Sequence, residues 1–215
     1  MVKLREKQSH LWVRDKDDWY VEPEEVSLAL FQHEEFVGPV WDPACGMGRI
    51  VEQAKNCGLK SIGSDIVPKN SYEARVHNFL EDDFDVFDFD NVVTNPPFSK
   101  AEEFVKKAIS IVPDGGKVAA ILPIVWLSGF STKRDWLPVS PLRRVYPISP
   151  RPSMPPGAAI LAGEKPGNGT KDFCWLVWEK GYKGKPEIEF LNTSIARAQL
   201  RTSSKGKTNA SSFKW

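Results

Sequence analysis

Hydrophobic and polar positions follow two recurring patterns along this chain, and together they predict strands separated by helices. Residues 22–36 repeat apolar side chains at helical spacing, beginning with a proline suited to a first helical turn. Residues 40–50 combine a short apolar strand, a glycine loop and the start of a second helix, which ends at Gly58. Further apolar runs predict strands at 59–66 and 89–98, the latter stopped by two prolines.

The second half of the chain continues this alternation. We predict an amphipathic helix over 99–112, an almost entirely apolar strand over 117–123, and two further strands over 142–148 and 172–182. The segment 150–170 is rich in Pro and Gly, which indicates a loop. Strands that alternate with helices at this spacing form βαβ units. The pattern therefore predicts an α/β fold with a mostly parallel sheet and helices on both faces.

Length and composition narrow the organisation of the chain. Its 215 residues, 41% of them hydrophobic, suit about one globular domain, which we place at 1–192. Residues 193–215 are rich in Ser, Thr, Lys and Asn without a sustained period, and we expect a disordered tail there. The chain has neither the apolar run of a membrane span nor the apolar core of a signal peptide. We therefore expect a cytoplasmic protein that does not enter membranes.

Charge and cysteine content change this picture only slightly. The net charge of +1 combines −8 over residues 1–100 with +9 over residues 101–215. Such asymmetry marks either a nucleic-acid partner or simply a basic, solvated tail. The three cysteines, Cys45, Cys57 and Cys174, form no CxxC pair, and the three histidines are scattered. We therefore predict no disulfide framework and no metal site.

Three motifs that carry chemistry each follow a predicted strand, at the edge where ligands bind in sheets of this kind. The first spans 42–48, where Gly46 and Gly48 allow a tight turn and close approach to a ligand. Asp42 before these glycines would repel a pyrophosphate but attract an ammonium or a sulfonium. The second motif is Asp65, placed like the acids that bind ribose hydroxyls. The alternative interpretations are a plain strand–helix turn and a turn-forming aspartate.

The third motif, Asn95-Pro96-Pro97-Phe98, is the most informative. Because proline has no N–H, Pro96 and Pro97 offer carbonyl acceptors without main-chain donors, and the Asn95 side-chain oxygen is a further acceptor. Two converging acceptors suit a planar –NH2 group, since holding both hydrogens aims the nitrogen lone pair at an electrophile. Phe98 offers an apolar face for stacking a planar base. The alternative interpretation is a proline-rich turn that ends a strand.

The order of these motifs resembles that of amino-group S-adenosylmethionine-dependent methyltransferases, particularly phage-type and bacterial DNA adenine-N6 methyltransferases. The similarity spans about residues 17–180 and rests on D-P-A-C-G-x-G and N-P-P-F. It implies a Rossmann-like class I methyltransferase fold with an antiparallel C-terminal strand, and S-adenosyl-L-methionine as cofactor. It also divides the domain into a cofactor-closing segment at 1–38, a cofactor half at 39–94 and a catalytic and substrate half at 95–192.

The resemblance implies a role for each matching residue. Catalysis falls to Asn95, Pro96, Pro97 and Phe98. Asn78 departs from the aspartate of the family's Asp-Phe-Leu stretch, yet its oxygen can still accept a hydrogen bond from an adenine amino group. The implied cofactor-binding residues are Tyr20, Pro23, Asp42, Pro43, Ala44, Gly46, Gly48, Asp65, Ile66, Asn78 and Phe79.

The resemblance favours adenine N6 in DNA as the acceptor, with RNA as the other nucleic acid. A paired amino nitrogen cannot reach the cofactor, so the base has to be flipped out of the duplex. The expected nucleic-acid contacts are Trp126, Lys133, Arg134 and Arg151. The alternatives are the same chemistry on an rRNA base or a protein glutamine amide, and an inactive nucleic-acid-binding module. The incomplete GxGxxG pattern and Asp42 argue against a nicotinamide-dependent dehydrogenase.

Overall fold

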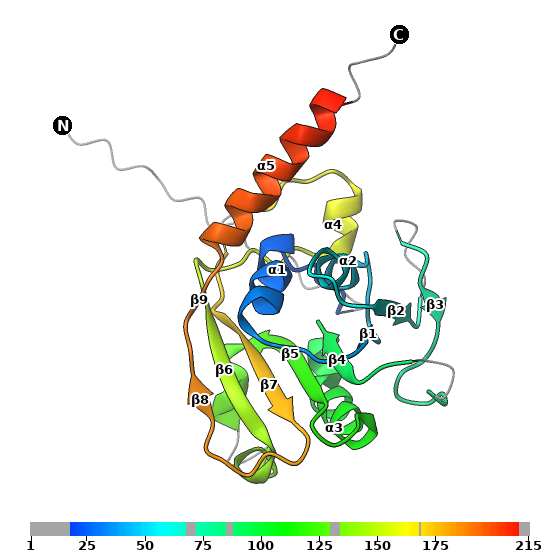
Figure 1. The fold of residues 1–215 in the computed structure, drawn as a ribbon, viewed down its shortest axis with the longest axis vertical. Coiled ribbons are helices and arrows are strands. Elements are labelled where there is room, and N and C mark those ends of the chain that lie inside the picture. The colour runs from blue at the N-terminus through cyan, green and yellow to red at the C-terminus, as the bar shows by residue number, and fades with distance from the viewer. Residues whose placement is uncertain (1–17, 68–71, 85–87, 130–133, 168, 211–215) are drawn as a thin grey trace, which may run out of the picture.

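A computed structural model describes residues 18–67, 72–84, 88–129, 134–167 and 169–210 (Figure 1). Its central sheet contains strands β1 Val40–Asp42, β2 Ser61–Asp65, β3 Arg75–Val76, β4 Asn91–Thr94, β5 Lys117–Pro123, β6 Leu142–Ser149, β7 Phe173–Glu179, β8 Glu187–Ile188 and β9 Leu191–Asn192. The α-helices are α1 Glu24–His33, α2 Arg49–Asn56, α3 Ala101–Ile111, α4 Gly157–Leu161 and α5 Ser194–Ala210. Short 3-10 turns cover Phe98–Lys100, Ile124–Gly129 and Leu137–Val139.

The strands lie in the order β3-β2-β1-β4-β5-β7-β6-β8, and β9 pairs with β6. The strands from β3 to β5 are mutually parallel, whereas β7 runs antiparallel to both of its neighbours, β5 and β6. This confirms the predicted α/β fold with a mostly parallel sheet and an antiparallel C-terminal strand. The two-residue strands β3, β8 and β9 were not predicted, because they are too short to show a period of two.

Both faces of the sheet are covered, as Figure 1 shows with α1 and α2 on one side and α3 on the other. The side chains of β5 divide accordingly. Ala119 and Ile121 pack in the cluster that contains residues of α1 and α2, while Ala120 and Leu122 pack in the cluster that contains residues of α3. A strand buried on both faces has to be apolar throughout, which is why the boundaries of β5 were predicted correctly from its sequence.

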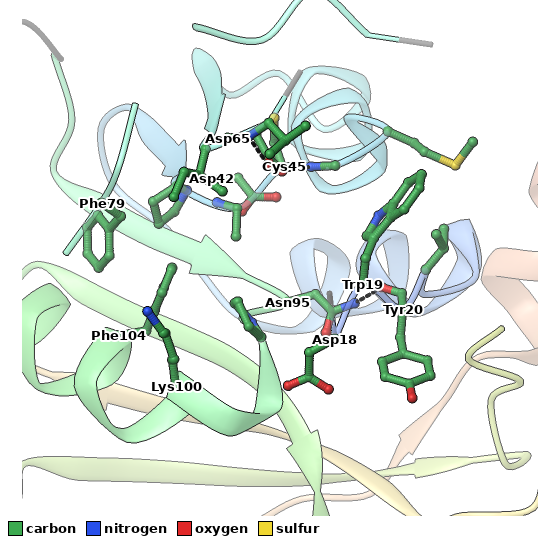
Figure 2. Close-up of a pocket in the computed structure, with 18 of the residues that line it drawn as sticks. Asp18, Trp19, Tyr20, Asp42, Cys45, Asp65, Phe79, Asn95, Lys100 and Phe104 are labelled. Carbon is green, nitrogen blue, oxygen red and sulfur yellow. Dashed lines mark hydrogen bonds between the residues drawn. The ribbon is translucent and has the colours of Figure 1, made fainter. Parts of the chain in front are cut away.

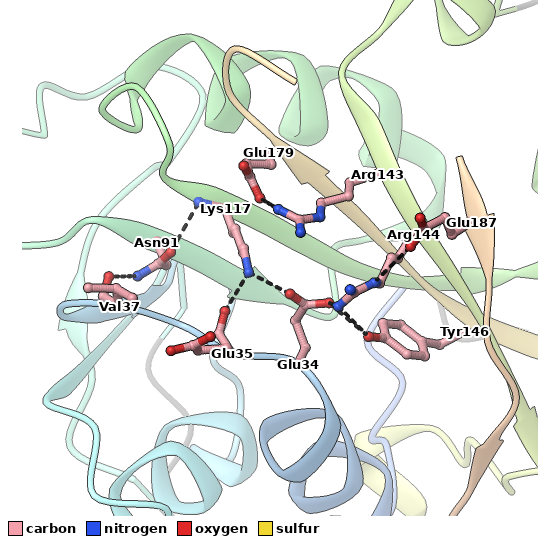
Figure 3. A network of polar contacts seen from close by, with 10 residues as sticks. All are labelled: Glu34, Glu35, Val37, Asn91, Lys117, Arg143, Arg144, Tyr146, Glu179 and Glu187. Carbon is pink, nitrogen blue, oxygen red and sulfur yellow. Dashed lines mark hydrogen bonds and ion pairs between the residues drawn. The ribbon is translucent and has the colours of Figure 1, made fainter. Parts of the chain in front are cut away.

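Helix α1 ends earlier than its sequence pattern predicts, for a reason that lies outside the helix. Glu34 leaves the helical conformation with φ −102° and ψ 127° and buries its carboxylate against the sheet. Lys117 donates to it at 2.5 Å, Tyr146 at 2.8 Å and Arg144 at 3.0 Å (Figure 3). A buried charge is tolerated only when it is paired and hydrogen-bonded, and this network meets that condition.

The prediction of a disordered tail over 193–215 is wrong for residues 194–210, which form α5. Tertiary contacts explain the difference. Ala196 is buried, Arg197 forms an ion pair with Glu25 at 2.8 Å, and Gln32 donates to Gln199 at 2.7 Å. The start of α5 is thus fixed to α1, and packing of this kind stabilises helices whose own sequence is weakly helical. No helix in the described ranges, α5 included, is long and apolar enough to span a bilayer.

Candidate active site

A cavity lies at the point where the strand order of the sheet reverses. Strand β1 has β2 on one side and β4 on the other, so the loops that follow β1 and β4 leave the sheet next to each other. Ligands bind at this crevice in open α/β sheets. A cavity of about 460 Å³ opens there, within the range of roughly 300–1,000 Å³ typical of small-molecule sites.

Most residues implicated by the sequence line this cavity. Those brought together are Tyr20, Asp42, Pro43, Ala44, Gly46, Asp65, Ile66, Asn78, Phe79, Asn95 and Pro97. Four others lie close in sequence but are not part of the lining: Pro23, Gly48, Pro96 and Phe98. Pro23 is instead the N-cap residue of α1 and Gly48 that of α2.

Two aspartates hold the glycine loop in place: Asp65 at the end of β2 binds it across the sheet, and Asp42 binds it locally. The N–H of Gly46 donates to Asp65 Oδ2 at 2.8 Å, and the N–H of Ala44 donates to Asp42 Oδ1 at 3.2 Å. Gly46 has a φ of +48°, and a Cβ there would lie 2.9 Å from Nε1 of Trp19. The loop therefore needs glycine both for its backbone conformation and for the close approach of the indole.

Gly48 supplies a prediction on loop integrity. Its φ is +78°, and a Cβ would lie 2.3 Å from a ring carbon of Tyr72. Gly58 has a similar φ of +82°, but no described atom lies within 4 Å of a Cβ built there. We expect Gly48→Ala to lower the free energy of unfolding by about 1–3 kcal/mol more than Gly58→Ala, since overpacking adds to backbone strain. Equal losses in denaturant titrations would show that the Tyr72 contact does not matter.

Two buried carboxyl groups give this cavity an acidic wall. Glu22 is 6% exposed and Asp42 is 2% exposed. Burial raises the pKa of each, and nearby Glu22 and Asp65 raise the pKa of Asp42 further, well above its usual range. Within the described part of the chain, neither carboxyl group forms an ion pair with Lys or Arg, although the charge of Arg49 lowers the pKa of Glu22. A cationic ligand would compensate these charges.

The far end of the cavity is aromatic. Figure 2 shows Phe79, Phe104 and Lys100 gathered at one end and Trp19 and Tyr20 at the other, with the acids and Asn95 between them. The rings of Phe79 and Phe104 lie 4.9 Å apart and are tilted by 37°. An elongated ligand with a cationic group near the acids and a planar group near these rings matches this distribution of side chains.

Asn95 extends its side chain from the end of β4 into the cavity with a fixed orientation. Its Nδ2 donates to the carbonyl oxygen of Tyr20 at 2.8 Å and to Oε2 of Glu22 at 2.9 Å. Since the carbonyl oxygen of Tyr20 can only accept a hydrogen bond, the side-chain atom of Asn95 that faces it has to be the nitrogen. Within the described ranges Oδ1 accepts no hydrogen bond from the protein, so it stays available to a donor in the cavity.

The rest of the Asn-Pro-Pro-Phe motif is arranged differently from the expectation. The carbonyl of Pro97 accepts from the N–H of Lys100 at 2.9 Å and closes a tight turn, whereas no described residue donates to the carbonyl of Pro96. Phe98 is stacked on Tyr20, with ring centroids 5.6 Å apart, and also packs against Phe173. In this arrangement a substrate base reaches the face of Phe98 only if Tyr20 moves.

Residues 18–22, which we call the N-terminal strap, contribute more to the cavity than the sequence indicated. Asp18 Oδ2 accepts from the N–H of Ser99 at 2.6 Å, Trp19 covers the glycine loop, and Glu22 holds Asn95. Only Tyr20 of this strap was identified from the sequence. Asp18, Trp19 and Glu22 belong to the segment 1–38 that was expected to close over the cofactor, but no individual role was predicted for them. Their partners lie between 27 and 81 positions further along the chain, so only the fold reveals these contacts.

The residues expected to contact nucleic acid are only partly accessible. Trp126 is 7% exposed and packs edge-on against Trp136 and Trp178, with centroids 6.3 Å from each, so in this fold it is a core residue with little surface for the expected nucleic-acid contact. The guanidinium of Arg134 lies 4.3 Å from the ring centroid of Trp126 and donates to the carbonyl oxygen of Trp126. Arg151 is exposed and pairs with Asp172 at 2.6 Å. Lys133 lies outside the described residues.

The strand order, the reversed β7 and the cavity at the crevice define a Rossmann-like fold of the class I methyltransferase type, and solved structures agree. A type I restriction-modification methyltransferase subunit from Streptococcus thermophilus matches with a TM-score of 0.61 and 14% identity, over 90% of this chain and 54% of that one. This chain thus spans about half the length of that subunit.

Two further structures share the fold. A protein from Listeria monocytogenes, provisionally assigned as a class I S-adenosylmethionine-dependent methyltransferase, matches with a TM-score of 0.51 and 13% identity, over 84% of this chain and 69% of that one. A protein from Pyrococcus horikoshii, provisionally assigned as an RNA methyltransferase, matches with a TM-score of 0.52 and 17% identity, over 73% and 84%. Neither a protein-family model nor a curated protein sequence matches this chain.

Proposed function

We propose that this protein is an S-adenosyl-L-methionine-dependent methyltransferase that acts on an exocyclic amino nitrogen, with adenine N6 in DNA as the favoured acceptor. One observation carries the proposal. The Asn95 amide is held by its nitrogen, which leaves its oxygen available in a cavity with an acidic wall and an aromatic end. Such an oxygen binds an –NH2 donor, and the acidic wall suits a cation.

The residues of the cavity fit the proposed cofactor. When bound, S-adenosyl-L-methionine supplies a methyl group made electrophilic by a sulfonium. Burial disfavours the charged forms of Asp42 and Glu22, so a sulfonium or an ammonium bound beside them would restore the charged forms and be held by them. Asp65 keeps lone pairs for ribose hydroxyls. Phe79 lies at the aromatic end, where an adenine ring would bind, and Asn78 and Ile66 also line the cavity.

The acceptor chemistry follows from the acceptors around Asn95. Oδ1 of Asn95, which lines the cavity, accepts one hydrogen of the amino group and so orients the nitrogen. The sequence motif assigns the second hydrogen to the carbonyl of Pro96, to which no described residue donates but which does not line the cavity. With the cofactor bound, methyl transfer would form an N–C bond at this nitrogen as the S–C bond breaks, and the electron pair of the S–C bond would remain on sulfur. The methylated nitrogen then loses a proton to solvent. No general base is needed before the bond forms.

A nucleic acid is the favoured substrate for two reasons that are independent of the cavity. Residues 101–215, which follow the catalytic motif, carry a net charge of +9, and phosphate contacts need such charge. Proteins named as a restriction-modification methyltransferase and as an RNA methyltransferase share the fold. A base in a duplex has to be flipped before its amino group enters the cavity.

The decisive experiment incubates the protein with methyl-labelled S-adenosyl-L-methionine and, in parallel, unmethylated DNA, RNA and protein extract. Digested products are then analysed by mass spectrometry. N6-methyladenine from DNA supports the proposal in full. Label in RNA or in protein glutamine keeps the chemistry and overturns the DNA substrate. No label in any acceptor, with the cofactor still bound, favours a nucleic-acid-binding module without catalysis.

Cofactor binding can be tested separately at Asp65. We expect Asp65→Ala to raise the dissociation constant of S-adenosyl-L-methionine roughly 10–100-fold in calorimetry, because hydrogen bonds to a charged group are the strong ones. Asp83→Ala is the matched control, since Asp83 is exposed and outside the cavity lining. An unchanged dissociation constant for Asp65→Ala, in a variant that unfolds at the wild-type temperature, would remove Asp65 from the cofactor site.

A further inference from the structure

We propose that Glu22 is a positioning residue that determines which atom of the Asn95 amide faces the acceptor nitrogen, an inference that rests on the proposed function. Its carboxylate accepts from Asn95 Nδ2 at 2.9 Å and is 6% exposed. The Asn-Pro-Pro-Phe motif contains Asn95 but gives no sign of Glu22, which lies 73 positions earlier in the chain. The contact therefore joins the N-terminal strap to the catalytic loop.

The need for such a residue follows from the symmetry of an amide. A rotation of about 180° around the last side-chain bond of Asn95 exchanges its oxygen and its nitrogen with almost no change in shape. In one orientation the acceptor amino group meets an oxygen that can accept its hydrogen. In the other it meets a second –NH2 group, and two donors repel each other. Only the first orientation aligns the acceptor nitrogen.

Two acceptors beneath Asn95 select the productive orientation. The carbonyl oxygen of Tyr20 accepts from Nδ2 at 2.8 Å, and the carboxylate of Glu22 accepts from the same nitrogen. After rotation Oδ1 would face both oxygens with no hydrogen between them. Glu22 supplies one of these two acceptors through its side chain, so its removal leaves the carbonyl of Tyr20 alone to select the orientation.

Glu22 is itself fixed on both sides. The N–H of Val21 donates to the carbonyl oxygen of Pro155 at 2.9 Å, and Arg49 Nη1 donates to the carbonyl oxygen of Glu22 at 2.7 Å. Pro23 follows, and a residue before proline is restricted to extended conformations. These contacts hold the backbone that carries the Glu22 side chain, and the burial of that side chain limits its movement, so the carboxylate offers Asn95 an acceptor in a set place.

The experiment compares kcat for methyl transfer in the full-length protein and its variants. Glu22→Gln keeps an acceptor oxygen, and we expect its kcat within about threefold of wild type. Glu22→Ala loses that oxygen and is expected to lose about tenfold or more in kcat. Both variants lose the same charge, so an effect on cofactor KM appears in both, and the difference between them isolates the acceptor. Glu24→Ala, at the start of α1, is the control for loss of an acid nearby.

A pair of variants separates positioning from a structural role. Asn95→Asp removes the donor and places the introduced carboxylate next to two other acceptors, the carbonyl of Tyr20 and the carboxylate of Glu22. We therefore expect kcat to fall 100-fold or more. Adding Glu22→Gln supplies a donor to the introduced carboxylate, and we expect the double variant to recover at least tenfold over Asn95→Asp alone. Additive losses, or equal kcat for Glu22→Ala and Glu22→Gln, would overturn the inference, since a structural role predicts either result.

A second measurement does not depend on turnover. The side-chain amide resonances of Asn95, assigned by their absence in Asn95→Ala, report the hydrogen bond directly in 15N–1H spectra. We expect Glu22→Ala to move these protons upfield and Glu22→Gln to move them much less. Unchanged resonances overturn the role of Glu22 even in an active enzyme. If wild type methylates no acceptor while the resonances shift as expected, the proposed function fails and the contact stands.

Discussion

Asn95→Ala is expected to lower kcat for methyl transfer about 10²–10³-fold, the range typical of losing one preorganised hydrogen-bonding group at a reacting centre. The physical reason is the loss of an acceptor, Oδ1, whose position is set by the bonds from Nδ2 to Tyr20 and Glu22. Because the proposed function assigns this acceptor to the substrate amino group and not to the cofactor, the dissociation constant of S-adenosyl-L-methionine should change less than threefold. Single-turnover methylation and calorimetry measure the two quantities.

Asn56→Ala provides the matched control for this prediction. Asn56 is the last residue of α2 and exposed, and its side chain donates to Gln53 within its own helix. We expect wild-type kcat from this variant. If Asn95→Ala also keeps kcat within tenfold while its unfolding temperature is unchanged, then Asn95 is not the acceptor that aligns the amino group, and the proposed chemistry is wrong.

Glu34→Ala is expected to lower the free energy of unfolding by about 3 kcal/mol, since removing one member of a buried ion-pair network leaves the others uncompensated. The side chain of Glu34 is fully buried, while those of Lys117 and Arg144 are 13% and 24% exposed. Together they join the end of α1 to β5 and β6 (Figure 3). For a chain of this size the loss corresponds to roughly 6–12 °C in unfolding temperature.

Glu35→Ala is the control, because the Glu35 side chain is exposed and only its backbone carbonyl meets Lys117. Its effect should stay within about 0.5 kcal/mol. A similar loss in both variants in urea titrations would mean that the network contributes nothing beyond the helix end itself.

The same network predicts a direction for stability against pH. Burial raises the pKa of Glu34, but hydrogen bonds and charge from Lys117 and bonds from Tyr146 and Arg144 outweigh it, so the pKa lies below its ordinary value of 4.5. The stabilisation is therefore complete above pH 4.5 and is lost as the pH falls through the folded-state pKa. Wild type should lose more stability than Glu34→Gln between about pH 5 and pH 3.

The parts of this protein that could be predicted from the sequence are those determined by local pattern. Strand β5 is apolar over almost its whole length. The loops after β1, β2 and β4 each carry a short motif whose chemistry can be recognised from its own residues. Since parallel strands place their carboxyl ends at one edge, the convergence of Asp42, Asp65 and Asn95 followed from the strand assignments alone.

The parts that could not be predicted depend on contacts distant in sequence. Ala196 and Arg197 belong to a stretch that looks disordered by composition, and only docking on α1 makes it a helix. An aromatic residue such as Trp126 has the same local pattern whether it faces solvent or a neighbouring Trp. The sequence motif predicts that Phe98 offers its ring to a planar base, whereas in the fold the ring is stacked on Tyr20.

The packing of Trp19 sets a rule for how this sequence can diverge. Its indole lies against two glycines distant in sequence, Gly46 of the glycine loop and Gly157 at the start of α4: a Cβ at Gly46 would approach it to 2.9 Å, and one at Gly157 would overlap it at 2.2 Å. Positions 19, 46 and 157 therefore form one steric unit. In a lineage that acquires a larger residue at 157, position 19 must become smaller, so the three sites should covary although 19 and 157 lie 138 positions apart in the chain.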